Sequence, residues 1–434
     1  MTESENHLLT RVGPGTPMGN LLRQYWMPLL QSNELSEKDG APLRVRLLGE
    51  NLIAFRNTDG KVGLIDHVCP HRCASLFFGR NEENGIRCLY HGWKFDIEGR
   101  CVDVPNEPAG SNFHEQIRTT AYPCVEKNGL IWTYLGPDRQ NPPPLPEVGW
   151  AMVGPNRRGA LRYQRECNWL QAMEGDFDSS HLSFLHLTFD AKHQGANEKK
   201  PGIEYYRNIA RMDTQPLLEV RETDAGVMYG ARRAAEAGQF YWRITQFLMP
   251  FYTSVPSYDG KNRDKVWVPI DDEHTMVWEP HWSSTRDLTE EERKGWKGRV
   301  APSGFLPDND DWLGRGRFAA NAANDYLHSR ARQQTSNFSG FENVTPIQDA
   351  AMQESMGPIC DRTREHLGAS DAAIVHMRRR LLNAVNAWNK DKKLPPEIQK
   401  PECYRIHGDQ MLLNASDSWA EHYAGKMKAD YAGL

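Results

Sequence analysis

Alternating apolar and polar residues mark the first third of the chain. Leu43, Val45 and Leu47 alternate with arginines, which is the period of two of a half-buried β-strand. Further along, Asp59-Gly60 separates two apolar runs and is a typical hairpin turn. The pattern therefore predicts a small antiparallel β-domain in this part of the chain.

The later part of the chain mixes two periodicities. Apolar residues recur at helical spacing from Ser370, a good N-cap, until Pro395-Pro396 stops the pattern. Residues 284–335 are polar and predict a long excursion, partly helical at Thr289–Lys297. Three apolar runs have the length of strands: Gly226–Tyr229, Tyr241–Met249 and Thr275–Trp278. The mixture predicts an α+β fold with an antiparallel sheet and helices.

A proline-rich stretch separates these two parts. Four prolines between residues 142 and 146 predict a stiff, extended linker, so we place the domain boundary at about residue 145. We expect residues 1–40 to be an N-terminal segment that packs on the larger, catalytic domain. Residues 41–145 then form the small β-domain, and residues 146–434 form the larger domain.

Composition narrows the class of protein. With 39% hydrophobic and 25% charged residues the chain is globular, and 52 basic against 57 acidic residues give a net charge of −5. That charge is too small to predict a nucleic-acid partner or an anionic membrane surface. No leader peptide or membrane-spanning run is visible, so we expect a soluble, cytoplasmic protein. Eight cysteines are too sparse for a disulfide scaffold.

Two cysteines and two histidines form the most specific pattern in the sequence. Cys69-x-His71 is followed after sixteen residues by Cys88-x-x-His91, so each half supplies one thiolate and one imidazole. This mixed order suits a Rieske [2Fe–2S] centre, in which one iron takes two thiolates and the other takes two imidazoles. A zinc site made from the same four residues is the alternative. We interpret nearby His67 as structural and the other six cysteines as ordinary thiols.

A second group of potential ligands follows the predicted boundary. Asp178-x-x-His181-x₄-His186 offers the two histidines of a facial triad, the arrangement that leaves positions open on a non-haem Fe(II). Residues five apart lie about 140° apart on a helix, so the segment must bend between the two histidines. Taken alone, the pattern also fits a buried histidine that is satisfied by Asp178.

Both patterns match one known family. CPHRCASLF…CLYHGWKFD resembles the Rieske domain of ring-hydroxylating oxygenases, and Tyr90 stands where the respiratory Rieske proteins have a clamping cysteine. N-W-x-Q-x-x-E-G-x-x-D-x-x-H-x₄-H, residues 168–186, resembles the oxygenase α-subunits of the phthalate dioxygenase type. The resemblance implies a small antiparallel β Rieske domain followed by a larger helix-grip-like catalytic domain.

The resemblance also implies roles for particular residues. The third iron ligand is expected at Asp349, with Glu342, Glu354 and Asp361 as competing carboxylates. Asp178 is expected to bridge the two metal sites in a homotrimer or in stacked trimers. It would accept the ring N–H of His181 in its own subunit and that of His91 from the adjacent subunit.

The implied activity is reductive O₂ activation on an aromatic acid, giving a cis-diol, a monohydroxylated product or O-dealkylation. The cofactors are a [2Fe–2S] cluster and a mononuclear Fe(II). Since the sequence contains no nucleotide-binding or plant-type ferredoxin motif, a separate NAD(P)H-dependent reductase of the flavin-plus-ferredoxin type is expected. The alternative function is that of a soluble Rieske electron-transfer protein without oxygenase activity.

Two arginines in predicted strands are candidates to bind the substrate carboxylate. An arginine inside a strand is costly unless it is paired, and its planar guanidinium matches a carboxylate. Arg243 in FYWRITQF is the first candidate and Arg221 in LLEVRETD is the second. The alternative is that both face solvent or pair with internal acids such as Glu222.

Overall fold

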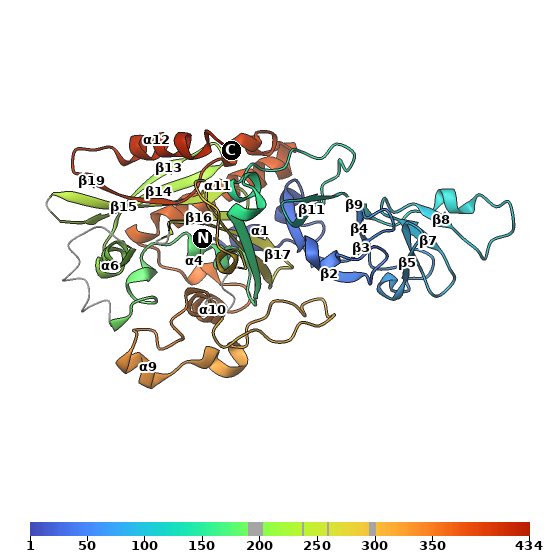
Figure 1. Ribbon diagram of the computed structural model, residues 1–434, viewed down its shortest axis with the longest axis horizontal. Helices are drawn as coiled ribbons and strands as arrows, with labels where there is room; N and C mark the ends of the chain where they lie inside the picture. The colour runs from blue at the N-terminus through green and yellow to red at the C-terminus, as the bar shows by residue number, and fades with distance from the viewer. Residues whose placement is uncertain (190–202, 237, 258–259, 295–300) are drawn as a thin grey trace. The chain divides into compact units, whose positions relative to one another are not determined.

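The computed structural model of the protein describes residues 1–189, 203–236, 238–257, 260–294 and 301–434 (Figure 1). The chain forms two compact units. The small unit consists of residues 12–145 and 308–315, and the large unit consists of residues 1–11, 146–307 and 316–434. The division between the units at Leu145 falls within the proline-rich stretch.

The N-terminal segment is shared between the two units. Only its first eleven residues, with α1 (Glu3–Thr10), join the large unit. The expectation that residues 1–40 pack there as a whole is therefore wrong. The remainder carries α2 (Pro17–Leu22) and β1 (Trp26–Gln31), and β1 pairs antiparallel with β11 (Leu130–Tyr134) in the small unit. Backbone hydrogen bonds between β1 and β11 hold β1 in the small unit. The apolar pattern of the sequence does not predict this pairing.

Three antiparallel sheets build the small unit, as the alternating pattern predicted. The first has the order β1-β11-β10, the second β2-β3-β4-β9 and the third β5-β6-β7-β8. Gly60 adopts φ +85° in the predicted hairpin between β3 and β4. The strands not yet given are β2 (Leu43–Leu47), β3 (Glu50–Arg56), β4 (Val62–Asp66), β5 (Arg80–Glu82), β6 (Gly85–Arg87), β7 (Lys94–Asp96), β8 (Cys101–Asp103), β9 (Ala121–Tyr122) and β10 (Cys124–Lys127).

Part of the predicted polar excursion belongs to the small unit. Residues 308–315 pack there through Trp312, whose ring meets His67 edge-on at 5.3 Å and lies 5.6 Å from the guanidinium of Arg44. Arg44 also donates to the backbone oxygen of Asp310 at 3.0 Å. His67 therefore has the structural role that the sequence suggested, and its Nδ1 lies 3.1 Å from the backbone oxygen of Asn51.

An eight-stranded antiparallel sheet forms the centre of the large unit. Its order is β12-β18-β17-β16-β15-β14-β13, and β19 pairs with the first half of β15. The predicted strand runs lie in β14, β15 and β18. The bounds are β12 (Arg158–Arg165), β13 (Leu217–Glu222), β14 (Gly226–Ala234), β15 (Gln239–Leu248), β16 (Tyr252–Val255), β17 (Asn262–Pro269), β18 (Thr275–Trp282) and β19 (Asp409–Asn414).

Helices cover both faces of this sheet (Figure 1). On one face, α4 (Trp169–Asp176) is followed by Phe177, which packs on Tyr229, and α6 (Ile203–Met212) stacks Tyr206 on Tyr241. On the other face, α12 (Trp419–Tyr431) stacks Trp419 on Trp242. The face that carries Tyr229 and Tyr241 is therefore the one that meets the candidate iron ligands after α4.

The remaining helices include the predicted C-terminal one. α11 (Ala372–Asp391) begins two residues after Ser370 and packs against β13 and β14. Of the helix expected at Thr289–Lys297, the structure describes α7 (Glu290–Arg293), capped by Thr289, while residues 295–300 lie outside the described part. Three further helices are α3 (Gly149–Met152), α9 (Arg330–Thr335) and α10 (Thr345–Ser355). No helix in the described ranges is long and apolar enough to cross a membrane.

Candidate metal centres

Two loops of the small unit that carry the cysteine–histidine pairs share one backbone structure. In the first loop, Cys69 N–H donates to the Ala74 oxygen and the Cys69 oxygen accepts from Cys73, both at 2.8 Å. In the second, Cys88 N–H donates to the Trp93 oxygen at 2.8 Å and the Cys88 oxygen accepts from Gly92 at 3.0 Å. Equivalent turns thus present one cysteine and one histidine from each side.

The turns need a left-handed residue at the same position. Cys73 has φ +59° and Gly92 has φ +79°, each four residues after the ligand cysteine of its loop. Glycine adopts this conformation freely, whereas a cysteine there is strained. Cys73 is exposed, so its role is to close the turn rather than to pair with a second thiol.

The four side chains fit a two-iron cluster better than a single ion. Among the described residues, no three of them bring their ligand atoms within 4.8 Å of one another, as a tetrahedral zinc site would require. The two rings lie together, with centroids 4.5 Å apart, and the two thiols interact with each other. This separation into a thiol pair and an imidazole pair matches a Rieske centre and argues against zinc.

Burial and orphaned atoms support this fit. Cys69 and Cys88 are almost fully buried, and burial, with the Cys88 thiol beside it, raises the pKa of Cys69 to about 11. A bound cation would reverse this preference and favour the thiolate. His91 Nδ1 is buried and has no hydrogen-bond partner in the described part of the chain. A nitrogen atom that binds iron would be in this state before the metal is added. His71 stacks on Trp93 at 4.3 Å, which fixes its ring.

In the large unit the structure brings together His181, His186 and Asp349. One ligand atom from each residue lies within 4.8 Å of the other two, and no other group of this kind occurs in the described ranges. The two Nε2 atoms are 3.1 Å apart, and Asp349 Oδ1 lies 3.2 Å from His186 Nε2 and 4.0 Å from His181 Nε2. Two imidazoles and one carboxylate on one side form the donor set of a facial triad.

Both imidazoles are oriented through their other nitrogen. His181 Nδ1 lies 3.0 Å from Asp178 Oδ2, and His186 Nδ1 lies 2.6 Å from Gln348 Oε1. An acceptor at each Nδ1 places the proton there, so each Nε2 presents a lone pair. Two lone pairs and a carboxylate oxygen that converge in a buried space fit a bound cation.

The electrostatics of this centre favour negative carboxylates. Burial opposes ionisation of Asp349, but His186 and His181 hold its pKa below the usual range. Burial likewise opposes the charge on Asp178, and the hydrogen bond and charge of His181 lower its pKa. Burial disfavours a charged His181, yet Asp178 and Asp349 raise the pKa of that ring. The site therefore attracts positive charge.

The chain bends between the ligands, as their spacing required. α4 ends at Asp176, and a short 3₁₀ turn at His181–Ser183 carries the first histidine. Asp178 accepts from the backbone N–H of Ser180 at 2.7 Å and of His181 at 3.2 Å. Its carboxylate thus shapes the turn and also orients the ring.

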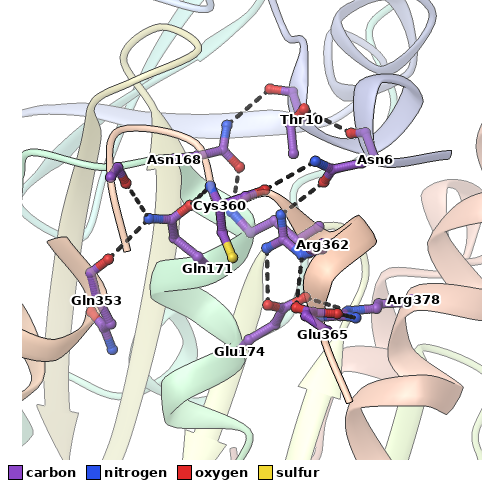
Figure 2. Close-up of polar contacts among 12 residues, drawn as sticks. Asn6, Thr10, Asn168, Gln171, Glu174, Gln353, Cys360, Arg362, Glu365 and Arg378 are labelled. Carbon is purple, nitrogen blue, oxygen red and sulfur yellow. Dashed lines mark hydrogen bonds and ion pairs between the residues drawn. The ribbon is translucent and has the colours of Figure 1, made fainter. Parts of the chain in front are cut away.

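Motif residues on α4 tie it to the chain that follows α10 (Figure 2). Figure 2 shows Glu174 between two guanidinium groups, at 2.9 Å from Arg362 and 2.6 Å from Arg378. Glu365 binds the other side of Arg378 at 2.6 and 2.9 Å. All four side chains are largely buried, so the network is a fixed connection rather than a surface pair.

Two further positions of the motif, Gln171 and Gly175, make similar ties. Gln171 donates to the backbone oxygens of Gln353 and Gly357 and accepts from Cys360 N–H at 2.7 Å (Figure 2). A Cβ on Gly175 would lie 2.3 Å from Gln353 Nε2, so a larger residue there would require the Gln353 side chain to shift. These ties set the spacing between the two-histidine turn and Asp349.

The two candidate arginines have different surroundings. Arg243 is buried on the sheet face that carries Tyr229 and Thr245, and its charge partly opposes the rise in the pKa of His181 that Asp178 and Asp349 cause. Arg221 is exposed on β13, with its guanidinium 5.1 Å from the ring centre of Trp419. Placing Arg221 at the substrate site was wrong, because strand periodicity does not tell which face of the sheet meets the ligands.

Two supporting residues carried no signal in the sequence. Arg233 is buried on the same face as Arg243 and donates to the oxygen and Oγ of Ser179 at 2.9 and 3.0 Å. Gln348 precedes Asp349, and only the folding of α10 against the two-histidine turn reveals its contact with His186. Among the competing carboxylates, Glu354 instead accepts from Tyr326 at 2.7 Å and Asp361 caps a short 3₁₀ turn.

Comparison with known families gives two matches. The Rieske [2Fe–2S] domain matches residues 25–123, and the family described as LigXa C-terminal domain like matches residues 133–432. Together they cover most of both units.

Similar characterised proteins are oxygenase subunits. The chain is 39% identical to the 3-chlorobenzoate-3,4-dioxygenase oxygenase subunit of Comamonas testosteroni, over 92% of each chain. It is 36% identical to the phthalate 4,5-dioxygenase oxygenase subunit of Pseudomonas putida, over 98% of this chain and 95% of that protein. It is 30% identical to the 5,5'-dehydrodivanillate O-demethylase oxygenase subunit of a Sphingobium species, over 95% and 88%.

Solved structures of similar fold include a complex of oxygenase and ferredoxin in carbazole 1,9a-dioxygenase. Its identity to this chain is 19% and the TM-score is 0.56, over 92% of this chain and 96% of that one. At this identity the likeness concerns the fold, and it matches the α+β architecture described above.

Proposed function

We propose that this chain, which belongs to the family of Rieske oxygenase α-subunits with a LigXa-like catalytic domain, oxidises an aromatic carboxylate. The observation that carries the proposal is the convergence of His181, His186 and Asp349 in the large unit, in a chain that also has a Rieske domain. An electron-transfer protein without oxygenase activity would have no use for this second donor set.

Seven side chains are assigned to the two cofactors. Cys69 and Cys88 hold one iron of the [2Fe–2S] cluster, and His71 and His91 hold the other. The mononuclear Fe(II) is held by the triad described above. When bound, this iron supplies O₂ activation with electrons from the cluster.

Asp178 is assigned the connection between the centres. Its Oδ2 orients His181, and its second oxygen accepts a backbone N–H from the same turn. In a homotrimer, or in stacked trimers, this carboxylate accepts the remaining ring N–H of His91 from a neighbouring copy. A carboxylate between two ligand imidazoles fixes both tautomers and gives electrons a short bonded route.

Arg243 is assigned to the substrate carboxylate. It lies on the sheet face that meets the triad, and its charge is felt at His181. Its Nη1 donates to the backbone oxygen of Pro256 at 3.3 Å, which helps to hold the guanidinium on this face. A guanidinium binds a carboxylate through two parallel hydrogen bonds, which would orient the ring next to the iron.

Electrons are assigned to a separate protein. The relatives are oxygenase subunits of larger systems, and the similar solved structures include an oxygenase–ferredoxin complex. We assign an NAD(P)H-dependent reductase of the flavin-plus-ferredoxin type as the donor.

Oxygen uptake with a panel of aromatic acids tests the proposal. Phthalate, 3-chlorobenzoate, phenoxybenzoate and methoxylated aromatic acids are supplied with NAD(P)H and a surrogate reductase, and the mass of each product identifies the reaction. We expect uptake that depends on one of these acids and is lost with its methyl ester, which keeps the shape without the charge. Equal uptake with acid and ester would overturn the carboxylate assignment, and no uptake with any substrate would overturn the oxygenase function.

A further inference from the structure

Gln348 makes a close contact to a candidate iron ligand that the sequence motifs do not include. Its Oε1 lies 2.6 Å from Nδ1 of His186, and both side chains are buried. Gln348 is also the residue immediately before Asp349 on α10. Asp349 Oδ1 lies 3.2 Å from the other ring nitrogen of His186, Nε2. Two consecutive residues of α10 therefore contact the two nitrogens of the same imidazole.

The orientation of the Gln348 amide is fixed from its other end. Ser339 Oγ donates to Asn337 Oδ1 at 3.5 Å and accepts from Gln348 Nε2 at 3.2 Å, which favours the orientation with the Gln348 oxygen toward the imidazole. Asn337 holds the Ser339 turn, accepting from Gly340 N–H at 2.7 Å and donating to the Phe341 oxygen at 3.0 Å. This chain of contacts favours the amide orientation that presents its oxygen, rather than an N–H, to the ring.

An amide oxygen at Nδ1 has a definite chemical consequence. The ring must carry its proton on Nδ1, which leaves a lone pair on Nε2, the atom that faces His181 Nε2 and Asp349. The two rings are thus held by unlike partners, since His181 has the carboxylate of Asp178 and His186 has a neutral amide. A second carboxylate here would add a further negative charge to a buried site that already contains Asp178 and Asp349.

We propose that Gln348 is a positioning residue that holds His186 as the Nδ1–H tautomer and so sets the affinity and symmetry of the iron site. The inference rests on the assignment of His181, His186 and Asp349 as ligands in the proposed function. Partners of this kind change metal affinity by about 10- to 100-fold when they are lost.

The test compares full-length variants by Fe(II) affinity in a chelator competition and by the EPR spectrum of the ferrous–nitric oxide adduct. In Gln348→Leu, which has no acceptor, we expect Fe(II) affinity to fall about 10- to 100-fold and the spectrum to change. Gln348→Glu restores an acceptor and should return the affinity to within a few-fold of wild type. Gln334→Leu is the matched control, because this glutamine of α9 is exposed, and it should keep the wild-type affinity.

Far-UV circular dichroism and a thermal melt of each variant report whether the large unit, which contains Gln348, is folded. An unchanged Fe(II) affinity and adduct spectrum in Gln348→Leu would overturn the proposal. If that variant does not fold, Ser339→Ala decides, since release of the amide should weaken Fe(II) binding several-fold and an unchanged affinity overturns the role. His186→Ala separates the two levels of inference: retained iron in that variant refutes the ligand assignment itself, whereas lost iron beside an unaffected Gln348→Leu refutes only the role of Gln348.

Discussion

Nε2 of His181 faces Nε2 of His186 at 3.1 Å while the Nδ1 atom of each ring lies against an acceptor. Neither ring can donate to the other while both keep a proton on Nδ1. The arrangement is therefore stable around a cation, and Asp349 supplies the negative charge beside it.

Removal of the carboxylate ligand should empty one metal site only. Asp349→Ala is expected to reduce iron from about three to about two per chain while the Rieske spectrum persists, because the cluster residues lie in the other unit. Iron and acid-labile sulfide analysis measures this. Asp361→Asn, on the same stretch of chain but capping a surface turn, should keep the full iron content. Equal iron in both variants would contradict the triad.

Neutralising Asp178 should slow electron transfer without releasing iron. Asp178→Asn keeps the size of the side chain but removes the charge that orients His181, so we expect turnover to fall about 100-fold with both metal sites loaded. Rapid mixing of reduced protein with O₂ and substrate follows the oxidation of the cluster directly. Wild-type oxidation rates in this variant would rule out the bridging role.

Arg243 should govern substrate affinity. Arg243→Gln removes a charged donor, worth about 1.5–3 kcal/mol, so KM for the aromatic acid should rise about 10- to 100-fold. Steady-state oxygen uptake gives kcat and KM separately. Arg221→Gln is the matched control, since that arginine is exposed beside Trp419, and its KM should equal that of wild type.

The buried network around Glu174 should dominate the stability of the large unit. Glu174→Gln leaves Arg362 and Arg378 without their shared carboxylate charge, which should lower the free energy of unfolding by about 3–5 kcal/mol. Chemical denaturation measures the loss. Glu222→Gln removes an exposed carboxylate 3.9 Å from Arg380, and it should cost at most about 1 kcal/mol.

Asp264 should make stability depend on pH. Burial raises its pKa to about 6, although Trp282 donates to its Oδ2, whereas in the unfolded chain the value is about 3.9. The folded state thus binds this proton more tightly, which adds stability at low pH that is lost as the pH rises from about 4 to about 6.

Asp264→Asn removes this ionisation and keeps an acceptor for Trp282. Its Tm relative to wild type should therefore increase between about pH 4.5 and about pH 7.5. Thermal melts at the two pH values test this, and a Tm difference that stays constant would show that Asp264 titrates normally.

Local patterns in the sequence were sufficient for many features. The period of two around Leu43–Leu47, the turn at Gly60 and the helical repeat after Ser370 each depend on neighbours in the chain, and each has its counterpart in the structure. The N-terminal segment was assigned wrongly beyond Arg11 because the partner of β1 is β11, about a hundred residues later. Long-range pairing of this kind leaves no local signal.

Residue type and spacing were enough to predict the first centre, since the order of Cys69, His71, Cys88 and His91 already favours a two-iron cluster. For the second centre, the family resemblance implied Asp349, and the tertiary structure showed that this carboxylate, rather than its competitors, meets the two histidines and which side chains support them. Asp349 meets the histidines because buried ties, Gln171 and Glu174 among them, hold α4 against the chain after α10. The same packing brings the Gln348 amide into contact with His186. The pairing of the strands places Arg243 in the interior and Arg221 beside Trp419. Burial and hydrogen bonding of this kind act between elements that are distant in the chain, so the local sequence does not reveal them.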